Sequence, residues 1–362
     1  MIRITTASAA LLATTALAQA GGLDRTALPI SPIFEEGDYV ELSFGQVQPS
    51  TSGTFALNGS SSGNMTQDYL NYGIAVKTDL TDRLSIAVIY EQAFGAAVTY
   101  RNADPTYPLV GAVGPFTAEL AGTELRAIAR YEIDDRWSVH GGLRYVTMSG
   151  EINFDATSQR LTYENSSDLG YLVGFSYEIP AIALRASLTY NSETHHDNDI
   201  SNSLPVATPL GPAAASTGRY TLPQSVNLDF QTGIAEGTLL LASVRWAEWT
   251  ETAINTQSAL GVIDYENDVF TYSLGVARRF TDEFALLGRV SYEQSNGGLA
   301  SNLDPIDGRI GLSLAGIYDI GNARITAGVN YTWLGDATTE NFGSEFEDNH
   351  AVGFGLRIGY TF

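Results

Sequence analysis

The sequence contains no cysteine and a single lysine, Lys77, and only 17% of its 362 residues are charged. Beyond the first 20 residues, no apolar run approaches the roughly 18–20 residues that a membrane-spanning helix needs. A helical membrane span in the mature chain is therefore excluded. The lack of cysteine fits an exported protein, but it excludes no compartment because many cytosolic proteins also lack cysteine.

Positive charge is scarce: 19 lysines and arginines stand against 41 aspartates and glutamates, which gives a net charge of −22. This balance excludes nucleic acid as a partner, since a phosphate backbone repels carboxylates. It also disfavours docking on an anionic cytoplasmic leaflet. Two interpretations of the acidity remain open. The charge keeps exposed loops soluble, or divalent cations bridge acidic loops to lipopolysaccharide.

The first 20 residues, Met1–Ala20, have the features of a secretory signal peptide. Arg3 provides the positive start, Ala9–Ala18 the short apolar region, and Ala18-Gln19-Ala20 the small-residue cleavage site. We expect the mature, exported chain to begin near Gly21.

The remaining hydrophobicity follows a period of two, most clearly at the C-terminus. Even positions there carry Val352, Phe354, Leu356, Ile358, Tyr360 and Phe362, and odd positions carry Ala351, Gly353, Gly355, Arg357, Gly359 and Thr361. Successive side chains of a strand point to opposite faces, so one face is apolar and the other small or polar. The same rhythm recurs in residues 169–178, 182–191, 284–293 and 324–333, with tyrosine or tryptophan near the ends, as in an interfacial aromatic belt.

Six short turns alternate with seven long, polar stretches. The short turns are 79–82, 134–136, 179–181, 235–237, 281–283 and 320–322, and the long stretches are 49–67, 102–115, 150–166, 191–219, 251–266, 294–307 and 335–348. This predicts an all-β fold, a transmembrane antiparallel β-barrel of 14 strands over residues 38–362, with short periplasmic turns, long extracellular loops and both termini in the periplasm. Because an open sheet edge is not viable in hydrocarbon, the first strand, 38–48, must pair with the last.

Residues 21–37 precede the barrel and show no alternation. Pro29 and Pro32 prevent a regular strand or helix there. Its apolar side chains are Leu23, Leu28, Ile30, Ile33 and Phe34. Two positions are possible: the segment enters the lumen as a short plug, or it hangs in the periplasm.

Several local motifs resemble the FadL family, the outer-membrane transporters of long-chain fatty acids and other hydrophobic compounds. They are Tyr220-Thr-Leu-Pro223, Val244-Arg-Trp-Ala-Glu-Trp-Thr250, Asp307-Gly-Arg-Ile-Gly311, Tyr190-Asn-Ser-Glu193 and Gly359-Tyr-Thr-Phe362. The resemblance covers essentially the whole mature chain. It implies a monomeric barrel that is plugged by an N-terminal hatch, formed here by Leu28, Ile30, Ile33 and Phe34. In that family a hydrophobic ligand leaves sideways through an inward kink in the third strand.

The third strand loses its alternation around Gly95, and glycine inside a strand marks a bulge, a corner or a close approach. The resemblance therefore places the kink and lateral exit at Phe94, Gly95 and Ala96. A plain barrel corner is the alternative.

The loop that follows is unusually apolar, and exposed apolar patches commonly bind ligands. Tyr107, Leu109, Val110, Val113 and Phe116 are candidates for the extracellular groove that first receives the ligand. Alternatively, this loop folds over the barrel mouth and its side chains only pack.

Arg144, Arg245 and Trp249 are the candidate ligand contacts in the lumen. The alternative for the two arginines is charge balance with carboxylates such as Glu178 and Glu293. Two departures from the family pattern leave hatch movement and carboxylate binding open: the N-terminal segment has no Asn-Pro-Ala sequence, and Ser149 stands where a basic residue would be expected.

No catalytic or metal-binding constellation stands out. His195, His196, Asp197 and Asp199 lie in a polar loop, and Asp304 with Asp307 lacks the ligand spacing of a calcium loop. We therefore expect no enzyme activity, no cofactor and no metal. The expected function is passive uptake of a hydrophobic small molecule across the outer membrane, in contact with its lipid and lipopolysaccharide. A general diffusion porin and a structural or adhesive barrel are the alternatives.

Overall fold

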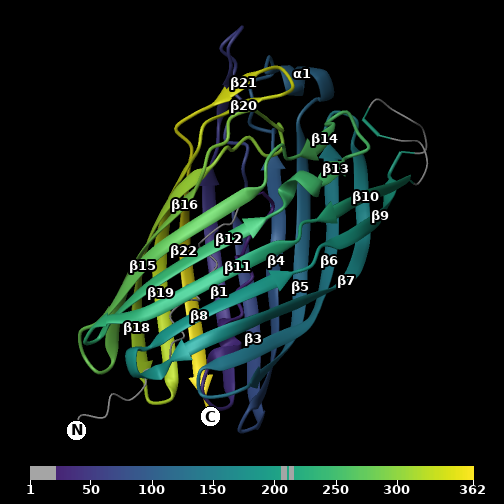
Figure 1. The fold of residues 1–362 in the computed structure, drawn as a ribbon. Helices are drawn as coiled ribbons and strands as arrows, with labels where there is room; N and C mark the ends of the chain where they lie inside the picture. The colour runs from purple at the N-terminus through teal and green to yellow at the C-terminus, as the bar shows by residue number, and fades with distance from the viewer. Residues whose placement is uncertain (1–21, 205–209, 212–215) are drawn as a thin grey trace.

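The computed structural model describes residues 22–204, 210–211 and 216–362 of the chain (Figure 1). The expected signal peptide, Met1–Ala20, lies outside these residues, so its cleavage stays a prediction. Within the described residues, no helix combines the length and the apolar character needed to cross a membrane.

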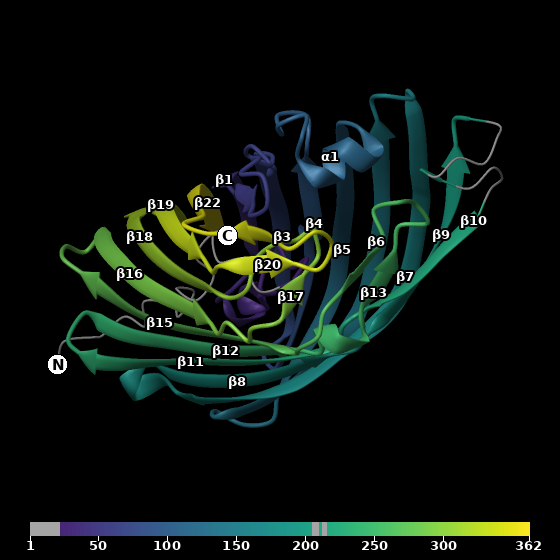
Figure 2. The ribbon, with the colours of Figure 1, turned by 90° about the horizontal axis from the view of Figure 1, so that it is seen from above.

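Fourteen antiparallel strands of the described residues form a closed ring (Figures 1 and 2). In ring order they are β1 (Tyr39–Ser50), β3 (Tyr69–Thr81), β4 (Leu84–Thr99), β5 (Phe116–Glu132), β6 (Trp137–Phe154), β7 (Gln159–Ile179), β8 (Leu184–Asn191), β11 (Ser225–Ala235), β12 (Thr238–Ala247), β15 (Val269–Arg279), β16 (Phe284–Glu293), β18 (Arg309–Ile320), β19 (Ala323–Leu334) and β22 (His350–Thr361). The first and last strands close the ring, from Tyr39↔Thr361 to Ser50↔His350. The predicted fold class and strand number are confirmed.

The period-two pattern matches the two faces of the wall. Along β22, Phe354, Leu356, Ile358 and Tyr360 are exposed on the outer face, whereas Gly353 is buried. The outer face elsewhere carries Phe44, Ile74, Leu143, Tyr171, Leu274, Val290, Leu314 and Val329, all exposed. Apolar side chains on the outside and polar ones within are the arrangement that hydrocarbon around a closed sheet requires.

Two of the predicted long loops are wrong. In residues 150–166, β6 runs on to Phe154 and β7 begins at Gln159, so only residues 155–158 connect them. In residues 191–219, β9 (Thr194–Asn202) pairs with the upper part of β7 and with β10 (Ser216–Leu222). The polar residues of β9 alternate between buried and exposed positions. Composition alone suggested a loop there, but a strand that stands above the lipid needs no apolar face.

The long connections gather at the opposite end of the ring from the short turns (Figure 1). Their small elements are β2 (Gly53–Phe55), α1 (Pro108–Val113), η3 (Trp249–Glu251), β13 (Ala253–Asn255), β14 (Val262–Asp264), β17 (Leu299–Ala300), β20 (Ala337–Thr339) and β21 (Ser344–Phe346). At the short-turn end, η2 (Pro180–Ile182) joins β7 to β8. Seen from above, β17 and β20 lie across the opening of the ring (Figure 2).

The segment from Gly22 to Asp38, called the N-terminal segment below, lies inside the ring. It contains the short helix η1 (Ser31–Phe34). Ile30 and Ile33 pack against a cluster that includes Ala87 and Ile128 of the wall. The amide nitrogen of the Asn227 side chain donates to the carbonyl of Ala27 at 2.7 Å. These contacts place the segment against the inner side of the barrel strands, and its role as a plug stays a prediction.

Candidate functional site

The ring is closed, but β3 and β4 pair over only part of their length. Their ladder runs from Thr81↔Leu84 up to Gly73↔Glu91 and stops there. Above that point β3 continues to Tyr69, paired with β1 alone. The β4–β5 ladder passes from Glu91↔Glu124 to Phe94↔Gly122, so Gln92 and Ala93 together oppose Thr123. Two residues facing one form a β-bulge, which bends the strand.

The N-terminal segment pairs with the edge of β4 that β3 leaves free. The backbone nitrogen of Arg25 donates to the carbonyl of Ala93 at 2.8 Å, and that of Gly95 donates to the carbonyl of Leu23 at 2.9 Å. Asp24 and Phe94 are bridge partners. We call the interrupted stretch, from Tyr69–Tyr72 of β3 across to residues 92–96 of β4, the wall gap.

Gly95 is required at the wall gap by its own geometry. Its φ is +151°, a value that side chains with a Cβ rarely adopt. A Cβ added there would lie 2.7 Å from the guanidinium carbon of Arg25 and 2.8 Å from the carbonyl oxygen of Leu120. The residues of the expected kink, Phe94, Gly95 and Ala96, lie just beyond Glu91, where the β3–β4 ladder ends, and their role as a lateral exit stays a prediction.

The two candidate lumen arginines are already paired. Arg144 donates to both carboxylate oxygens of Glu124, at 2.8 and 3.0 Å, and to the carbonyl of Ser192 at 2.6 Å. Arg245 donates twice to one oxygen of Asp24, at 3.0 and 2.8 Å. The charge-balance alternative thus describes both, although their partners are Glu124 and Asp24 rather than the two carboxylates expected.

Other lumen-facing charges form pairs of the same kind. Glu178 pairs with Arg130 and Glu293 with Arg309. Arg126 pairs with Glu91 and with Glu124. Trp249, the third candidate contact, is fully buried; its ring lies 5.0 Å from that of Tyr265, and a Cβ on Gly22 would come within 2.6 Å of its indole.

The five candidate groove residues, Tyr107, Leu109, Val110, Val113 and Phe116, are all buried. The ring of Tyr100 stacks on those of Tyr107 and Phe116 at 5.8 and 5.0 Å. They lie in one apolar cluster with Phe154 and Phe346. Their arrangement corresponds to the alternative, a loop packed over the mouth of the barrel.

Residues of the same cluster line a small apolar cavity of about 50 Å³. Its walls include Leu23, Ala96, Val98, Leu120, Ile152, Tyr163, Tyr220, Ile254, Ile263 and Leu303, with Glu119, Asn198, Thr256 and Asp304 as polar members. The cavity exceeds the ~10–15 Å³ that one water needs but is smaller than the engineered ~150 Å³ cavity known to bind benzene. Leu23 and Ala96 belong both to the cavity and to the surroundings of the wall gap.

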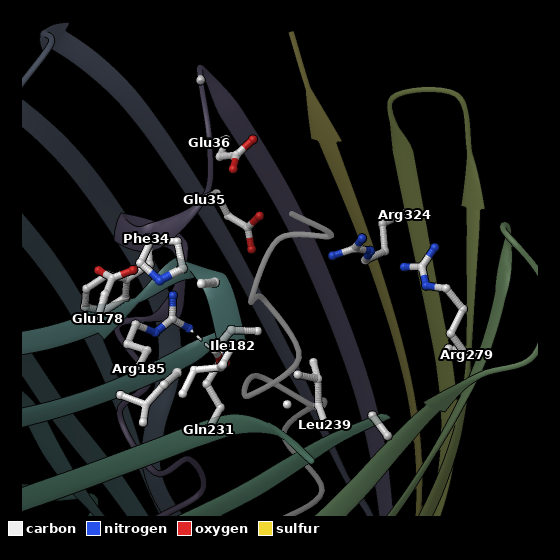
Figure 3. A pocket seen from close by; sticks show the side chains of 18 of the residues that line it. Phe34, Glu35, Glu36, Glu178, Ile182, Arg185, Gln231, Leu239, Arg279 and Arg324 are labelled. Atoms are coloured by element: carbon white, nitrogen blue, oxygen red, sulfur yellow. Dashed lines mark hydrogen bonds between the residues drawn. The ribbon is translucent and has the colours of Figure 1, made fainter. Parts of the chain in front are cut away.

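A larger cavity of about 1270 Å³ opens at the short-turn end; we call it the vestibule (Figure 3). Charges of both signs line it, among them Glu35, Glu36, Arg185, Arg279 and Arg324. Figure 3 shows Phe34 next to Arg185 and Glu178, while Arg324 and Arg279 lie on the other side of the space. The N-terminal segment thus extends from the apolar cavity, at Leu23, to the vestibule, at Phe34.

Burial raises the pKa of Glu35 to about 7, and the nearby Arg324 partly opposes this shift. Phe34 is held by two guanidinium groups, whose carbon atoms lie 4.9 Å (Arg130) and 4.3 Å (Arg185) from the ring centroid. Sequence reasoning did not identify Asp24 or Arg25 as site residues. The available signal was the adjacent opposite charges of Asp24 and Arg25, shortly before the mostly apolar residues 27–34.

The residues considered as metal ligands, His195, His196, Asp197 and Asp199, lie on β9 and do not assemble into a metal site. Asp197 pairs with Arg219 at 3.3 Å, and His195 lies exposed, 3.6 Å from Glu193. Across the described part of the chain, no group of three potential metal ligands is found.

No protein-family model matches the sequence, and no curated protein matches it. Solved structures do match. A FadL homologue from Pseudomonas aeruginosa superimposes with a TM-score of 0.71 at 14% identity, covering 96% of this chain and 98% of that one. The fold is that of the FadL-type channels.

Two toluene transporters share the FadL-type fold. TodX from Pseudomonas putida matches with a TM-score of 0.66 at 12% identity, covering 97% of this chain and 99% of its own. TbuX from Ralstonia pickettii matches with a TM-score of 0.61 at 13% identity over 97% and 99% of the two chains. These neighbours are described as transporters or channels, not enzymes. The resemblance expected from the sequence is confirmed at the level of the fold.

Proposed function

We propose that the chain is an outer-membrane channel for the uptake of hydrophobic or amphipathic small molecules, long-chain fatty acids among them. The observation that carries the proposal is the apolar cavity beside the wall gap, with Leu23 and Ala96 common to both. The fold neighbours include a FadL homologue and toluene transporters, so fatty acids and aromatic hydrocarbons are both candidate cargoes.

In the proposed route, cargo passes from the apolar cavity sideways through the wall gap into the bilayer. Each buried CH₂ group is about 0.8 kcal/mol more stable away from water, so apolar cargo favours this exit over the charged vestibule. The N-terminal segment acts as the hatch, held by Leu28, Ile30, Ile33 and Phe34. The cluster around Tyr107 and Phe116 caps the extracellular side, and cargo enters when that cluster opens.

A general diffusion porin needs a continuous polar path through the barrel. Here the N-terminal segment and the apolar cluster lie between the vestibule and the long loops. A structural or adhesive barrel has no use for a cavity beside an interrupted ladder. Both features therefore favour a selective channel.

Two measurements on the same protein test this proposal. A deletion strain that regains uptake of a radiolabelled fatty acid on complementation, with little steady current from the purified protein in planar bilayers, is the expected result. Large steady currents without uptake would identify a porin. Cell fractionation and N-terminal sequencing of the mature chain test the outer-membrane location and cleavage after Ala20.

A further inference from the structure

Two side chains in the wall of the apolar cavity carry polar atoms without a partner. Asn198 of β9 and Tyr220 of β10 both line the cavity, and they are only 1% and 8% exposed. Oδ1 of Asn198 and the hydroxyl of Tyr220 are buried and have no hydrogen-bond partner. The large majority of buried side-chain polar atoms in proteins are hydrogen-bonded, so two unpaired atoms in one cavity wall need a physical explanation.

The pairing of β9 with β10 brings these two side chains together. Tyr220 lies opposite His196, and their rings stack with the centroids 5.5 Å apart. Asn198, two residues further along β9, lies opposite Gly218, which has no side chain to partner it. Asn198 and Tyr220 are therefore diagonal neighbours on one face of an antiparallel pair, close enough for one ligand group to contact both.

The hydrogen bonds of Asn198 fix which of its atoms is free. Its Nδ2 donates to the carbonyl of Met148 at 2.9 Å and to that of Glu164 at 2.6 Å. The free atom is therefore the amide oxygen, which can only accept, whereas the hydroxyl of Tyr220 can donate as well as accept. A ligand hydroxyl matches both, because it can donate to Asn198 and accept from Tyr220.

The charged members of the cavity lining disfavour an anion. Glu119 and Asp304 belong to it, whereas no lysine or arginine is among the described residues that line the cavity. A carboxylate head group beside Asn198 and Tyr220 would meet only like charges in this lining. A pure hydrocarbon would leave both polar atoms unpaired. A neutral hydroxyl group avoids both penalties.

The cavity, about 50 Å³ in volume, has room for the hydroxyl end of a molecule only. Glu119 lines the cavity and is also exposed on β5, so the cavity reaches the outside of the wall there. Ala96, which lies in the wall gap, is a further lining residue. The apolar remainder of the molecule can extend past these two residues toward the wall gap.

We propose that Asn198 and Tyr220 bind the hydroxyl group of a neutral, hydroxylated apolar cargo such as a phenol. The inference rests on the proposed function and makes it narrower, because the cavity then selects hydroxylated molecules over hydrocarbons and carboxylates. A site built to hydrogen-bond a hydroxyl rejects the analogue that lacks it, since the buried polar groups would be left unpaired. A fatty acid would occupy this cavity with its apolar end.

The test compares p-cresol, toluene and p-toluate, which share a ring and a methyl group and differ in a hydroxyl, a hydrogen or a carboxylate. Binding to the full chain in nanodiscs is measured by titration calorimetry at about pH 7, with empty nanodiscs as the blank. At this pH p-cresol is neutral and p-toluate is ionised. The wild type should bind p-cresol more tightly than either of the others, by about tenfold or more.

Tyr220→Phe keeps the ring and removes a hydroxyl that has no partner in the structure. It should weaken p-cresol binding by about fivefold, change toluene binding by less than about twofold, and leave the unfolding temperature unchanged. Asn198→Leu should weaken p-cresol binding by about tenfold or more. That variant also loses two structural hydrogen bonds, so Tyr220→Phe decides the test if it fails to fold. Tyr171→Phe, on the exposed outer face of β7, is the matched control and should change neither affinity.

Equal affinity of the wild type for p-cresol and toluene would overturn the inference and leave the proposed function standing, as a channel for hydrocarbons. Unchanged p-cresol binding by Tyr220→Phe would also overturn it and leave the unpaired atoms to water. Tighter binding of p-toluate than of p-cresol would overturn it too, because the cavity would then select anions. If none of the three compounds binds, this inference fails, and the uptake of radiolabelled fatty acid decides the proposed function separately.

Discussion

Two neighbouring stretches of the barrel wall complete their backbone hydrogen bonding differently. In the continuous stretch β19, β22 and β1 pair without interruption, and β1 meets β22 along its whole length, from Tyr39↔Thr361 to Ser50↔His350. In the interrupted stretch, on the far side of the β1–β3 pair, the β3–β4 ladder ends at Gly73↔Glu91. Unpaired backbone costs several kcal/mol in hydrocarbon, so a free edge has to be covered. Residues 23–25 of the N-terminal segment cover the edge of β4. How well this edge stays covered therefore depends on how firmly the segment docks.

The largest expected effect comes from removing the carboxylate that anchors this cover. Asp24→Ala leaves Arg245 buried without its carboxylate partner, with only Ser225 and Asn227 still accepting from it. Breaking a buried ion pair of this kind costs about 3–5 kcal/mol. We expect the N-terminal segment to leave the lumen in most molecules. Because the chain has no cysteine, a single nitroxide attached through Glu36→Cys reports the mobility of the segment.

The matched change on the continuous side is Glu41→Ala, which removes the carboxylate beside Arg357 across the β1–β22 seam. It should leave the nitroxide immobile, because the seam is held by its full ladder. Equal mobility in both variants would mean that the ion pair at the gap has no special role in docking.

A slightly smaller effect is expected from Gly95→Val. The new side chain would collide with Arg25 and the Leu120 carbonyl, and the backbone at φ +151° adds strain of about 1–3 kcal/mol. Uptake of radiolabelled fatty acid should fall about tenfold or more, since 1.4 kcal/mol corresponds to a factor of ten.

Gly288→Val in β16 is the control for this substitution, because a Cβ there has no atom within 4 Å. It should leave uptake unchanged. Full uptake by the Gly95 variant would count against any passage through the wall gap.

The docking of the segment should also depend on pH, through Glu35. Burial raises its pKa in the docked state from an ordinary 4.5 to about 7, opposed in part by Arg324, Arg185 and Arg357, while Glu41 raises it further. Because the docked state holds the proton more tightly, docking is strongest below about pH 4.5 and weakens as the pH rises to 7, by at most about 3 kcal/mol.

The Glu36→Cys nitroxide should therefore become more mobile between about pH 5 and 8. Glu35→Gln should remove this dependence, and a label at Asp282→Cys, in the turn between β15 and β16, should not respond at all. A label that becomes less mobile as the pH rises would contradict the assignment to Glu35.

The wall was predictable from sequence because a barrel in lipid imposes one rule on every strand. The alternation in residues 324–333 and 350–362 follows that rule and matches β19 and β22. The rule applies only to strands in contact with lipid, so the polar residues of β9 carry no strand signal and predict a loop. The site was harder to predict because it depends on long-range pairs. The alternation of side chains along the strand predicts that Arg245 faces the lumen. Nothing local in the sequence connects it to Asp24, 221 residues away.

The smallest expected effect is at the vestibule end of the segment, far from the gap. Phe34 presents its ring to Arg130 and Arg185, and a partly desolvated cation–π contact is worth about 0.5–2 kcal/mol. Phe34→Leu keeps an apolar side chain but removes the ring, so docking of the segment should weaken by about 1 kcal/mol. This corresponds to a roughly fivefold rise in the fraction of mobile nitroxide attached at Glu36→Cys. Phe34→Tyr should behave as wild type, and Phe354→Leu, on the outer face of β22, should have no effect. If the segment of the Phe34→Leu variant docks as firmly as that of the wild type, the two arginines do not hold it. Its position then depends on the contacts at the wall gap and on packing.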